Sequence, residues 1–544
     1  MKIVHGLTFD NIRGDIFGGL TAAVVALPLA LAFGVASGAG PMAGLYGAII
    51  LGFFAALFGG TPSQISGPTG PMTVVMAVII ANYIDQPALA FTVVIMGGAF
   101  QVMFGMLRLG RYINLVPFPV ISGFMSGIGC IIIALQLAPM LGQSHPGAGV
   151  VASLMALPGD IAIANWHAVG IAGMTLAIVY LTPKKIQRLV PTPLIALIVG
   201  TVAVWMFFSG APVLGEIPTG FPKLQMPALD WVVLTDMVGS ALVLALLGSI
   251  DSLLTSLVAD GITRTHHESD RELFGQGIGN MLAGLFGAIP GAGATMRTVV
   301  NVRAGGKTPI SGVVHALVLL AIVMGLGPLA AHIPYAVLAG ILIKVGIDII
   351  DWGYLKRMHG APRAGVIIML VVLGLTVFVD LIVAVSVGIV AASLLFVKRM
   401  SDLQLENVRS GSDGLPYDAA EQEILDRHAD DIMIYHISGP MNFGAAKGMV
   451  KQIAVSTDFK VLILDLTDVT FIDTSASMAI ENIMINAAEQ GLQVILIGLQ
   501  ARVKETLNRL GVTKVIPADH TFDTRLDALV YTAGLLEQAA RKED

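Results

Sequence analysis

Cysteine and charge are both scarce in this chain of 544 residues. The single cysteine, Cys130, excludes an intramolecular disulfide. Only 12% of the residues are charged and 55% are hydrophobic, with a mean hydropathy of +0.81, which excludes an ordinary soluble protein and indicates a membrane protein. The net charge of −6 gives no indication of nucleic-acid binding. The sequence contains no Walker motif, metal cluster or nucleophile triad, so we expect neither an enzyme nor a bound cofactor.

The few charges are unevenly distributed. Up to about Met400 the chain is a series of apolar runs, whereas the following stretch, SDLQLENVRSGSDGLPYDAAEQEILDRHADD, has a soluble composition. We therefore expect a membrane domain over 1–400, a linker and the start of the tail over 401–429, and a cytosolic domain over 430–544. The polar start of the chain predicts no cleavable signal peptide.

Twelve apolar runs are suitable for crossing a bilayer, which takes roughly 20 residues of helix. Two shorter pieces, 71–83 and 295–304, bring the expected count to about fourteen, with both termini cytoplasmic in a multi-pass protein of the plasma (inner) membrane. On this count nearly all loop lysines and arginines lie inside and only Lys223 lies outside, as the positive-inside rule requires. The longer runs are 16–34, 42–59, 90–107, 115–138, 167–182, 193–209, 236–258, 272–288, 311–328, 334–350, 364–379 and 381–397.

Each short piece follows a stretch rich in glycine and proline, GGTPSQISGPTGP in one case and GAIPGAGAT in the other. We expect Thr69 and Thr295 to be the N-caps of two half-helices, with Pro71 in the first turn of one of them. Such half-helices begin near the membrane midplane and direct free N–H groups and a positive dipole end into a site. The alternative, that these glycines only allow close helix packing, does not explain the proline, threonine and short helix occurring together twice.

Paired interrupted segments predict an inverted repeat with the substrate site between its halves. Asp251 precedes Thr295 by 44 positions, and the same interval before Thr69 falls on Val25 in the first span. The span that contains Asp251 is therefore the expected symmetry mate of the first.

Asp251 lies in the middle of a predicted span, in GSIDSLLTSLVADG, with Thr255 one turn further on the same face. A carboxylate at this depth costs about 2.5–3.5 kcal/mol and marks an ion or proton site. Its oxygen-rich surroundings suit a small cation. The alternative is a structural ion pair with Arg297, which is compatible with an anion site beside it. Arg297 adds a full positive charge to the first turn of the second half-helix, where anions are already favoured.

Two histidines remain. His266 and His267 lie on a predicted inner loop without cysteine or carboxylate at a zinc-like spacing, and we interpret both as solvated.

Several of these stretches carry a family resemblance. NIRGDIFGGLTAAVVALPLALAFGVASGAG, GPTGPMTVVM, GSIDSLLTSLVADG and GQGIGNMLAGLFGAIPGAGATMRTVVN resemble the sulfate permease (SulP) family of anion transporters. Within it they are most similar to the BicA-type sodium-dependent bicarbonate transporters. The resemblance implies a seven-plus-seven inverted repeat, core and gate domains that move like an elevator, and a homodimer. It also implies a sodium site at Asp251, Thr255, Gly293, Ala294 and Thr295, and an anion site that we place at Thr69, Gly70, Ala294, Thr295 and Arg297.

After Asp430 the pattern becomes that of a small α/β domain. DIMIYHI, KVLILDL and LQVILIGL are predicted strands, and 444–455, 474–489, 500–510 and 522–541 are predicted helices. LTDVTFIDTSASMAIENI resembles the STAS domains that follow SulP transporters and are related to anti-sigma-factor antagonists. The resemblance makes Ser475 a possible phosphorylation site, although helix capping by Asp473 or Thr474 explains the triplet equally well.

Three hypotheses follow for the activity. The first is sodium-coupled symport of a small anion, most simply bicarbonate. The second is a proton-coupled sulfate or dicarboxylate symporter in which Asp251 carries the proton. The third is a passive anion channel with a regulatory domain.

Overall fold

The structure is a computed structural model that describes residues 4–113, 117–143, 149–187, 190–208, 210–215, 222, 224–379, 381–406, 408–410, 417–442, 459–515 and 517–543. Contacts divide the chain into two units, Met1–Val390 and Ala391–Asp544, and each is described by itself.

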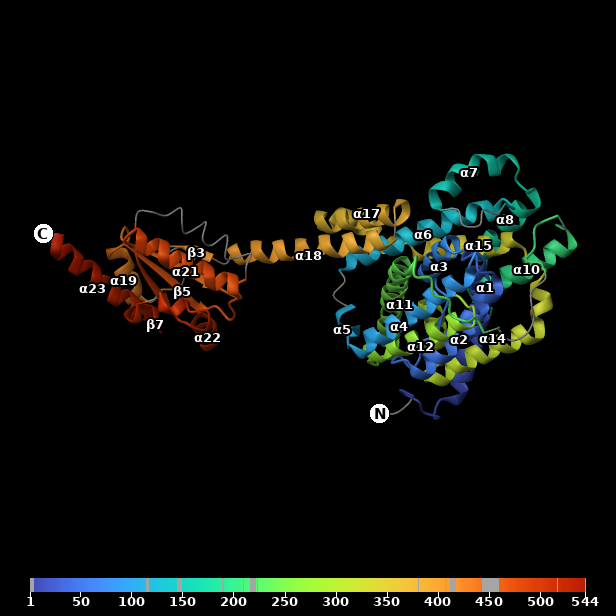
Figure 1. Cartoon of the computed structure of the whole chain (residues 1–544), viewed down its shortest axis with the longest axis horizontal. Coiled ribbons are helices and arrows are strands. Elements are labelled where there is room, and N and C mark those ends of the chain that lie inside the picture. The colour runs from blue at the N-terminus through green and yellow to red at the C-terminus, as the bar shows by residue number, and fades with distance from the viewer. Residues whose placement is uncertain are drawn as a thin grey trace. The chain divides into compact units, whose positions relative to one another are not determined.

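Each of the fourteen predicted positions holds a helix, and Figure 1 labels most of these helices. Six described helices are long and apolar enough to cross a membrane by themselves, or seven if the bent pair Val150–Ala162 and Trp166–Leu181 forms one span. Proline in the first turn starts α2, α3, α4, α6 and α10, where its missing N–H costs no hydrogen bond. The fourteen are α1 (Ile12–Ala36), α2 (Pro41–Phe58), α3 (Gly70–Asn82), α4 (Pro87–Met106), α6 (Phe118–Met140), α8 (Trp166–Leu181), α10 (Thr192–Met206), α11 (Leu234–Thr263), α12 (Ser269–Leu285), α13 (Thr295–Arg303), α14 (Pro309–Ala330), α15 (Tyr335–Ile349), α17 (Arg363–Phe378) and α18 (Leu381–Glu406).

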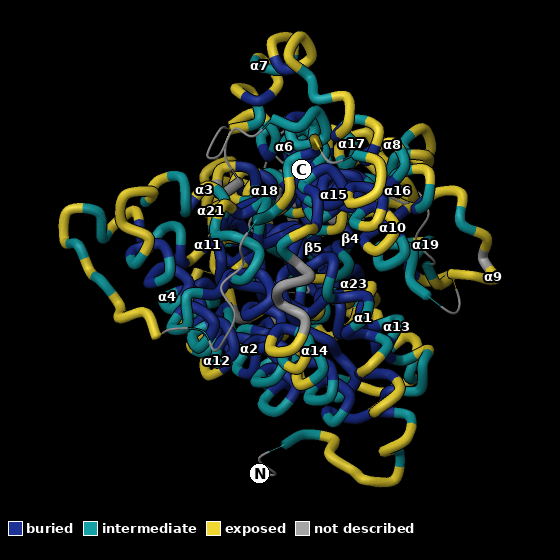
Figure 2. Tube along the Cα trace, turned by 90° about the vertical axis from the view of Figure 1, so that its right-hand side faces the viewer, coloured by how far each residue is buried: buried dark blue, intermediate teal, exposed yellow. Residues whose placement is uncertain are grey.

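The sequence analysis missed several shorter helices between these spans. The longest, α7 (Val150–Ala162), is exposed along most of its length (Figure 2). The others are α5 (Gly110–Ile113), α9 (Lys184–Gln187), α16 (Trp352–Arg357) and the 3-10 turn η1 (Met358–Gly360).

The membrane helices form two groups. In one, α12 packs on α2 and α4, α11 packs on α4, and α14 packs on α1 and α2. In the other, α6 packs on α15 and α17, and α8 packs on α10 and α15. The groups meet where α1 and α3 contact α6, α10 and α15. This division of the helices into two groups corresponds to the expected core and gate domains.

The two interrupted segments cross each other as a short antiparallel sheet. Strand β1 (Ser66–Gly67) pairs with β2 (Ala292–Gly293), with Ser66 opposite Gly293 and Gly67 opposite Ala292. The paired residues are 227 positions apart at Ser66 and Gly293 and 225 positions apart at Gly67 and Ala292, on either side of the 226 positions that separate Thr69 from Thr295. Applied to α1, α2, α3 and α4, this interval falls on α11, α12, α13 and α14. The inverted repeat therefore has a structural counterpart at its centre.

The capping prediction is correct for one half-helix and wrong for the other. Thr69 is the N-cap of α3, in extended backbone, but its side chain makes no capping hydrogen bond. Ala294 is the N-cap of α13, and Thr295 is the first residue of that helix. The hydroxyl of Thr295 contacts α11 instead, which explains why it does not cap its own helix.

In the tail, the five-stranded sheet has the order β3-β4-β5-β6-β7. Strand β3 (Val408–Ser410) is antiparallel to β4 (Ile432–Ser438), and β5 (Val461–Asp468), β6 (Gln493–Ile497) and β7 (Thr521–Phe522) continue in parallel. Because successive strand residues face opposite sides, Leu462 and Leu464 pack with α21 (Thr474–Glu489) and α22 (Ala501–Arg509). Ile463 packs on the other side with α19 (Ala419–Arg427) and α23 (Arg525–Glu543).

The three strands and the last three helices predicted for the tail are thus confirmed. The predicted helix at 444–455 lies outside the described residues. Strand β3 and helix α19, with a capping box formed by Asp418 and Glu421, lie within the segment 401–429, in which we expected the linker and the start of the tail. Two 3-10 turns, η2 (Val512–Lys514) and η3 (Ala518–His520), complete the unit.

Candidate functional site

Helix α11 carries the candidate cation ligands. Asp251 and Thr255 lie one turn apart on it, as their spacing predicts. Thr255 is fully buried, and its Oγ1 donates to the carbonyl oxygen of Gly293 at 2.9 Å and lies 2.7 Å from Oγ1 of Thr295. Oδ2 of Asp251 is buried and has no hydrogen-bond partner among the described residues. The helix therefore brings a free carboxylate oxygen and an oxygen cluster to the same side.

The backbone at β2 is fixed from both sides. The N–H of Gly293 donates to Oγ of Ser252 at 3.0 Å, and the N–H of Ala294 donates to the carbonyl oxygen of Ile65 at 2.8 Å. Gly293 cannot carry a side chain, because a Cβ there would collide with the amide of Gln64. The carbonyl oxygen of Gly293 is thus held in place as a potential ligand.

The start of α3 lies where the two helix groups meet. Thr69 is buried, and its Oγ1 has no partner among the described residues. A Cβ on Gly70 would lie 2.7 Å from Cδ1 of Ile349 and 2.9 Å from Cδ1 of Ile132, so this glycine permits close contact with α15 and α6. The N-termini of α3 and α13 supply the positive dipole ends expected at an anion site.

Arg297 is buried next to the crossing of the two segments, where its guanidinium lies against Gly67. It is 2% exposed, and its Nη2 donates to the carbonyl oxygen of Pro68, which ties α13 to the stretch before α3. Its Nη1 has no partner in the described part of the chain. Arg297 therefore joins the two half-helices and adds its positive charge next to their N-termini.

A small cavity opens beside Asp251. Its volume is about 20 Å³, which is roughly the space for one water molecule. Besides Asp251, side chains of α3, α6, α11 and α18 line it: Pro71, Val120, Ile121, Phe124, Met125, Leu247, Ile250 and Val385. The carboxylate thus faces an otherwise apolar boundary between the two helix groups.

The opposite charges of Asp251 and Arg297 attract each other, and the Thr69 hydroxyl lies near the carboxylate without reaching hydrogen-bond geometry. Even so, Oδ2 of Asp251, Nη1 of Arg297 and Oγ1 of Thr69 all stay unpaired within the described structure. A structural ion pair would satisfy these atoms, because unpaired buried polar groups are costly. The arrangement favours a site that receives charged ligands.

The sequence analysis missed the buried polar side chains that support this site. Oδ1 of Asn280, on α12, accepts from the N–H of Gly291 at 2.9 Å, and Nδ2 of Asn280 donates to the carbonyl oxygen of Gly291 at 3.0 Å. Asp15 of α1 accepts hydrogen bonds from the N–H groups of Lys307 and Thr308. Glu272, also of α12, is 1% exposed. The available signal was a lone acid or amide in or beside an apolar run: Glu272 and Asn280 fall inside the predicted span 272–288, and Asp15 directly precedes the span 16–34.

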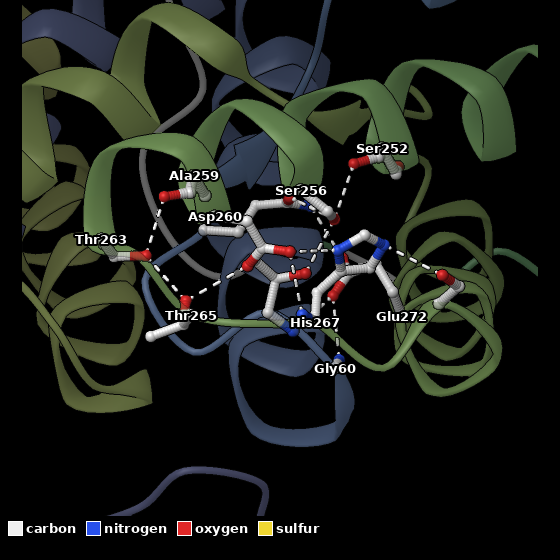
Figure 3. A network of polar contacts seen from close by, with 12 residues as sticks. Gly60, Ser252, Ser256, Ala259, Asp260, Thr263, Thr265, His267 and Glu272 are labelled. Carbon is white, nitrogen blue, oxygen red and sulfur yellow. Dashed lines mark hydrogen bonds and ion pairs between the residues drawn. The ribbon is translucent and has the colours of Figure 1, made fainter. Parts of the chain in front are cut away.

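One interpretation of the histidines is wrong. His266 is exposed as expected, but the side chain of His267 is only 7% exposed. Its Nδ1 lies 2.7 Å from Oδ2 of Asp260, and its Nε2 lies 2.9 Å from Oγ of Ser269 (Figure 3). The end of α11 and the start of α12 are therefore joined through this ring, which a sequence pattern cannot indicate.

In the tail, Ser475 is the exposed second residue of α21. Asp473 is the N-cap, since its Oδ1 accepts from the N–H of Ala476 at 2.8 Å, so the capping interpretation is confirmed. On the opposite side of the sheet, buried Asp465 accepts hydrogen bonds from Arg525 at 2.9 Å and from Thr467 at 2.6 Å.

Comparison with known proteins identifies the family. The profile of the Sulfate permease family matches residues 12–372, and that of the STAS domain matches residues 423–528. The chain is 48% identical to the bicarbonate transporter BicA of Picosynechococcus sp. over 97% of its length and 96% of that protein. It is 34% identical to the putative sulfate transporter YvdB of Bacillus subtilis, over 95% of this chain and 97% of that one.

Solved structures agree. The transmembrane domain of a cyanobacterial bicarbonate transporter BicA matches with 53% identity and a TM-score of 0.67, covering 71% of this chain and all of that one. SLC26A9 matches with a TM-score of 0.84 over 98% of this chain and 92% of that one, and at 19% identity it supports the fold alone. This chain combines a polytopic helical membrane unit with a parallel-sheet α/β tail. The chain belongs to the sulfate permease family of anion transporters and ends in a STAS domain.

Proposed function

We propose that the protein is a secondary transporter that couples the entry of sodium to the uptake of bicarbonate. The observation that carries the proposal is the set of three buried, unpaired polar atoms: Oδ2 of Asp251, Nη1 of Arg297 and Oγ1 of Thr69. A carboxylate oxygen calls for a cation, whereas a guanidinium N–H calls for an anion. The high identity to two cyanobacterial bicarbonate transporters, 48% in each case, supports bicarbonate as that anion.

In this proposal, sodium is a transported ion held by Asp251, Thr255 and Thr295 together with the backbone at Gly293 and Ala294. Carboxylate, hydroxyl and carbonyl oxygens are the hard ligands that such a cation prefers. Bicarbonate occupies the space before the N-termini of α3 and α13, at Thr69, Gly70, Ala294 and Thr295, within the field of Arg297. Each ion offsets the charge that the other brings, so each raises the affinity for the other.

We further propose that the group containing α1–α4 and α11–α14 carries the site across the membrane by moving against the other group. Both ion sites belong to this first group, and the side chains that face Asp251 from α6 and α18 are apolar. Because this boundary is apolar, few hydrogen bonds between the two helix groups must break when one group slides along the other. Cytoplasmic termini, residence in the plasma (inner) membrane and a homodimer complete the proposal.

The test is uptake of labelled bicarbonate and of labelled sulfate into vesicles, with sodium, potassium or a pH gradient imposed separately. Sodium-dependent bicarbonate uptake is the expected result. Sulfate uptake driven by protons would instead favour the symporter in which Asp251 carries the proton. Flux that follows the anion gradient alone would favour a channel.

A further inference from the structure

Glu272 is the most completely buried acid of α12, at 1% exposure, and its carboxylate accepts four hydrogen bonds. Oε2 accepts from the N–H groups of Gly60 and Thr61, both at 2.9 Å. Oε1 accepts from the amide groups of Gln64 at 2.7 Å and Gln276 at 2.8 Å. A buried carboxylate is tolerated only when its oxygens are satisfied in this way, so the stretch from Gly60 to Gln64 is fixed to α12.

The hydrogen bonds to Glu272 require a close approach between the end of α2 and the start of α12. A Cβ on Gly59 would lie 2.9 Å from Oε2 of Glu272, and a Cβ on Gly60 would collide with the carbonyl oxygen of Glu268. The two glycines that end α2 therefore let the unwound chain lie directly on the first turns of α12 (Figure 3).

Gln64 connects this hydrogen-bond network to α11, the helix that carries Asp251. Oε1 of Gln64 accepts from Oγ of Ser256 at 3.0 Å, and the same hydroxyl lies 2.7 Å from Oγ1 of Thr61. Ser256 follows Thr255 directly on α11. The amide of Gln64 also lies against the Cα of Gly293, where a Cβ would strike it. One buried side chain thus supports both α11 and the backbone of β2.

We propose that Glu272 and Gln64 are positioning residues of the cation site. Neither contributes an atom to that site. Glu272 fixes the amide of Gln64, and Gln64 holds the carbonyl of Gly293 in register with the hydroxyl of Thr255. The inference rests on the proposed function, because it assigns these residues a role in sodium affinity. A purely structural role would lower the amount of folded protein and leave the apparent affinity for sodium unchanged.

Glu272→Gln tests the inference. The new amide has one acceptor oxygen instead of two. When that oxygen accepts from the N–H groups of Gly60 and Thr61, its NH2 group faces the NH2 group of Gln64, and Gln64 loses its anchor. We expect the sodium concentration for half-maximal uptake to rise about tenfold, while the rate at saturating sodium stays within about twofold of wild type. Glu268→Gln is the matched control: Glu268 is the N-cap of the same helix, its side chain is 52% exposed, and its variant should behave as wild type.

A double variant, Glu272→Gln with Gln64→Glu, supplies the rescue. The amide at 272 can donate to the carboxylate at 64, and that carboxylate can still accept from Ser256. We expect it to recover most of the lost sodium affinity, which a general loss of packing would not do. Ser256→Ala covers the case in which Glu272→Gln does not fold, because it leaves all four bonds to Glu272 intact. It should raise the half-maximal sodium concentration several-fold.

The outcomes separate cleanly. Sodium-dependent wild-type uptake together with unchanged sodium affinity in the folded variants would overturn the positioning role alone. Lost affinity in Glu272→Gln that the double variant fails to recover would also overturn it. Uptake by the wild-type protein that ignores sodium would overturn the proposed function and this inference with it.

Discussion

The hydroxyl groups of Thr255 and Thr295 lie 2.7 Å apart, although one is in the middle of α11 and the other begins α13. The Thr255 hydroxyl also donates to the carbonyl oxygen of Gly293. Three oxygens from three elements of the second repeat, α11, β2 and α13, therefore converge on one point. This convergence requires α13 to start late, because an unbroken helix would enclose the carbonyl of Gly293 in its own hydrogen bonds.

Thr255→Val should weaken sodium binding and leave the fold intact, since valine has nearly the same shape as threonine. Loss of one oxygen that interacts with a charged ligand costs about 1.5–3 kcal/mol, so the half-maximal sodium concentration should rise by about tenfold or more. Thr255→Ser keeps the oxygen and should remain near wild type. Sodium titrations of labelled bicarbonate uptake measure both, and equal affinities in the two variants would contradict the assignment.

Asp251→Asn should abolish sodium dependence together with most of the uptake. The substitution keeps the shape of the side chain but removes the negative charge that makes a dehydrated cation tolerable at this depth. Asp251→Glu should retain weak coupling with poorer affinity, because its charge is present but displaced. Uptake is compared in sodium and in potassium. Equal wild-type rates in the two salts would remove the sodium site and the main support for bicarbonate.

Ala294→Leu should block transport without preventing folding or insertion. Ala294 is 7% exposed and forms the N-cap of α13, so a bulky side chain there fills the space in front of the helix N-terminus. Its backbone bond to Ile65 does not involve the side chain. The check is uptake alongside the amount of folded protein in the membrane. Normal uptake by a well-expressed variant would contradict an anion site between the two half-helices.

The tail beginning at about Asp402 should fold as a separate fragment and melt cooperatively, with stability that falls in acid. Burial raises the pKa of Asp465, but hydrogen bonds from Thr467, His436 and Arg525 outweigh it and hold the pKa below its ordinary value. A pKa below the unfolded value of about 3.9 gives stability that is present at neutral pH and lost as the pH falls through the folded pKa.

Asp465→Asn should therefore destabilise this fragment at pH 7 by about 1–3 kcal/mol and flatten its stability curve below pH 4. Asp523→Asn is the control, because that residue is exposed on the surface of the same unit. Thermal melts between pH 3 and pH 7 measure the difference. An unfolded fragment would contradict the separable module, and identical acid sensitivity in the variant would contradict the role of Asp465.

The sequence by itself determined the class and plan of this protein. Scarce charge and long apolar runs can be recognised one residue at a time, because most side chains that face lipid or a helical core are apolar. The twofold occurrence of glycine, proline and threonine before a short helix located the breaks at Thr69 and Thr295, since these residue types prevent or start helices by local geometry. Alternating apolar residues located the strands of the tail in the same way.

Only the tertiary structure decided which polar groups support the site. Gln64 and Glu272 are separated by 208 positions, yet a hydrogen bond of 2.7 Å joins them, and no periodicity links positions so far apart. The same holds for His267, which is buried because Asp260 and Ser269 surround it, and for Thr295, whose hydroxyl contacts Thr255 instead of capping α13. Local sequence patterns indicate where a helix begins, where it ends and which of its faces is apolar. Packing between helices decides where a buried polar atom finds its partner, because that partner comes from another part of the chain.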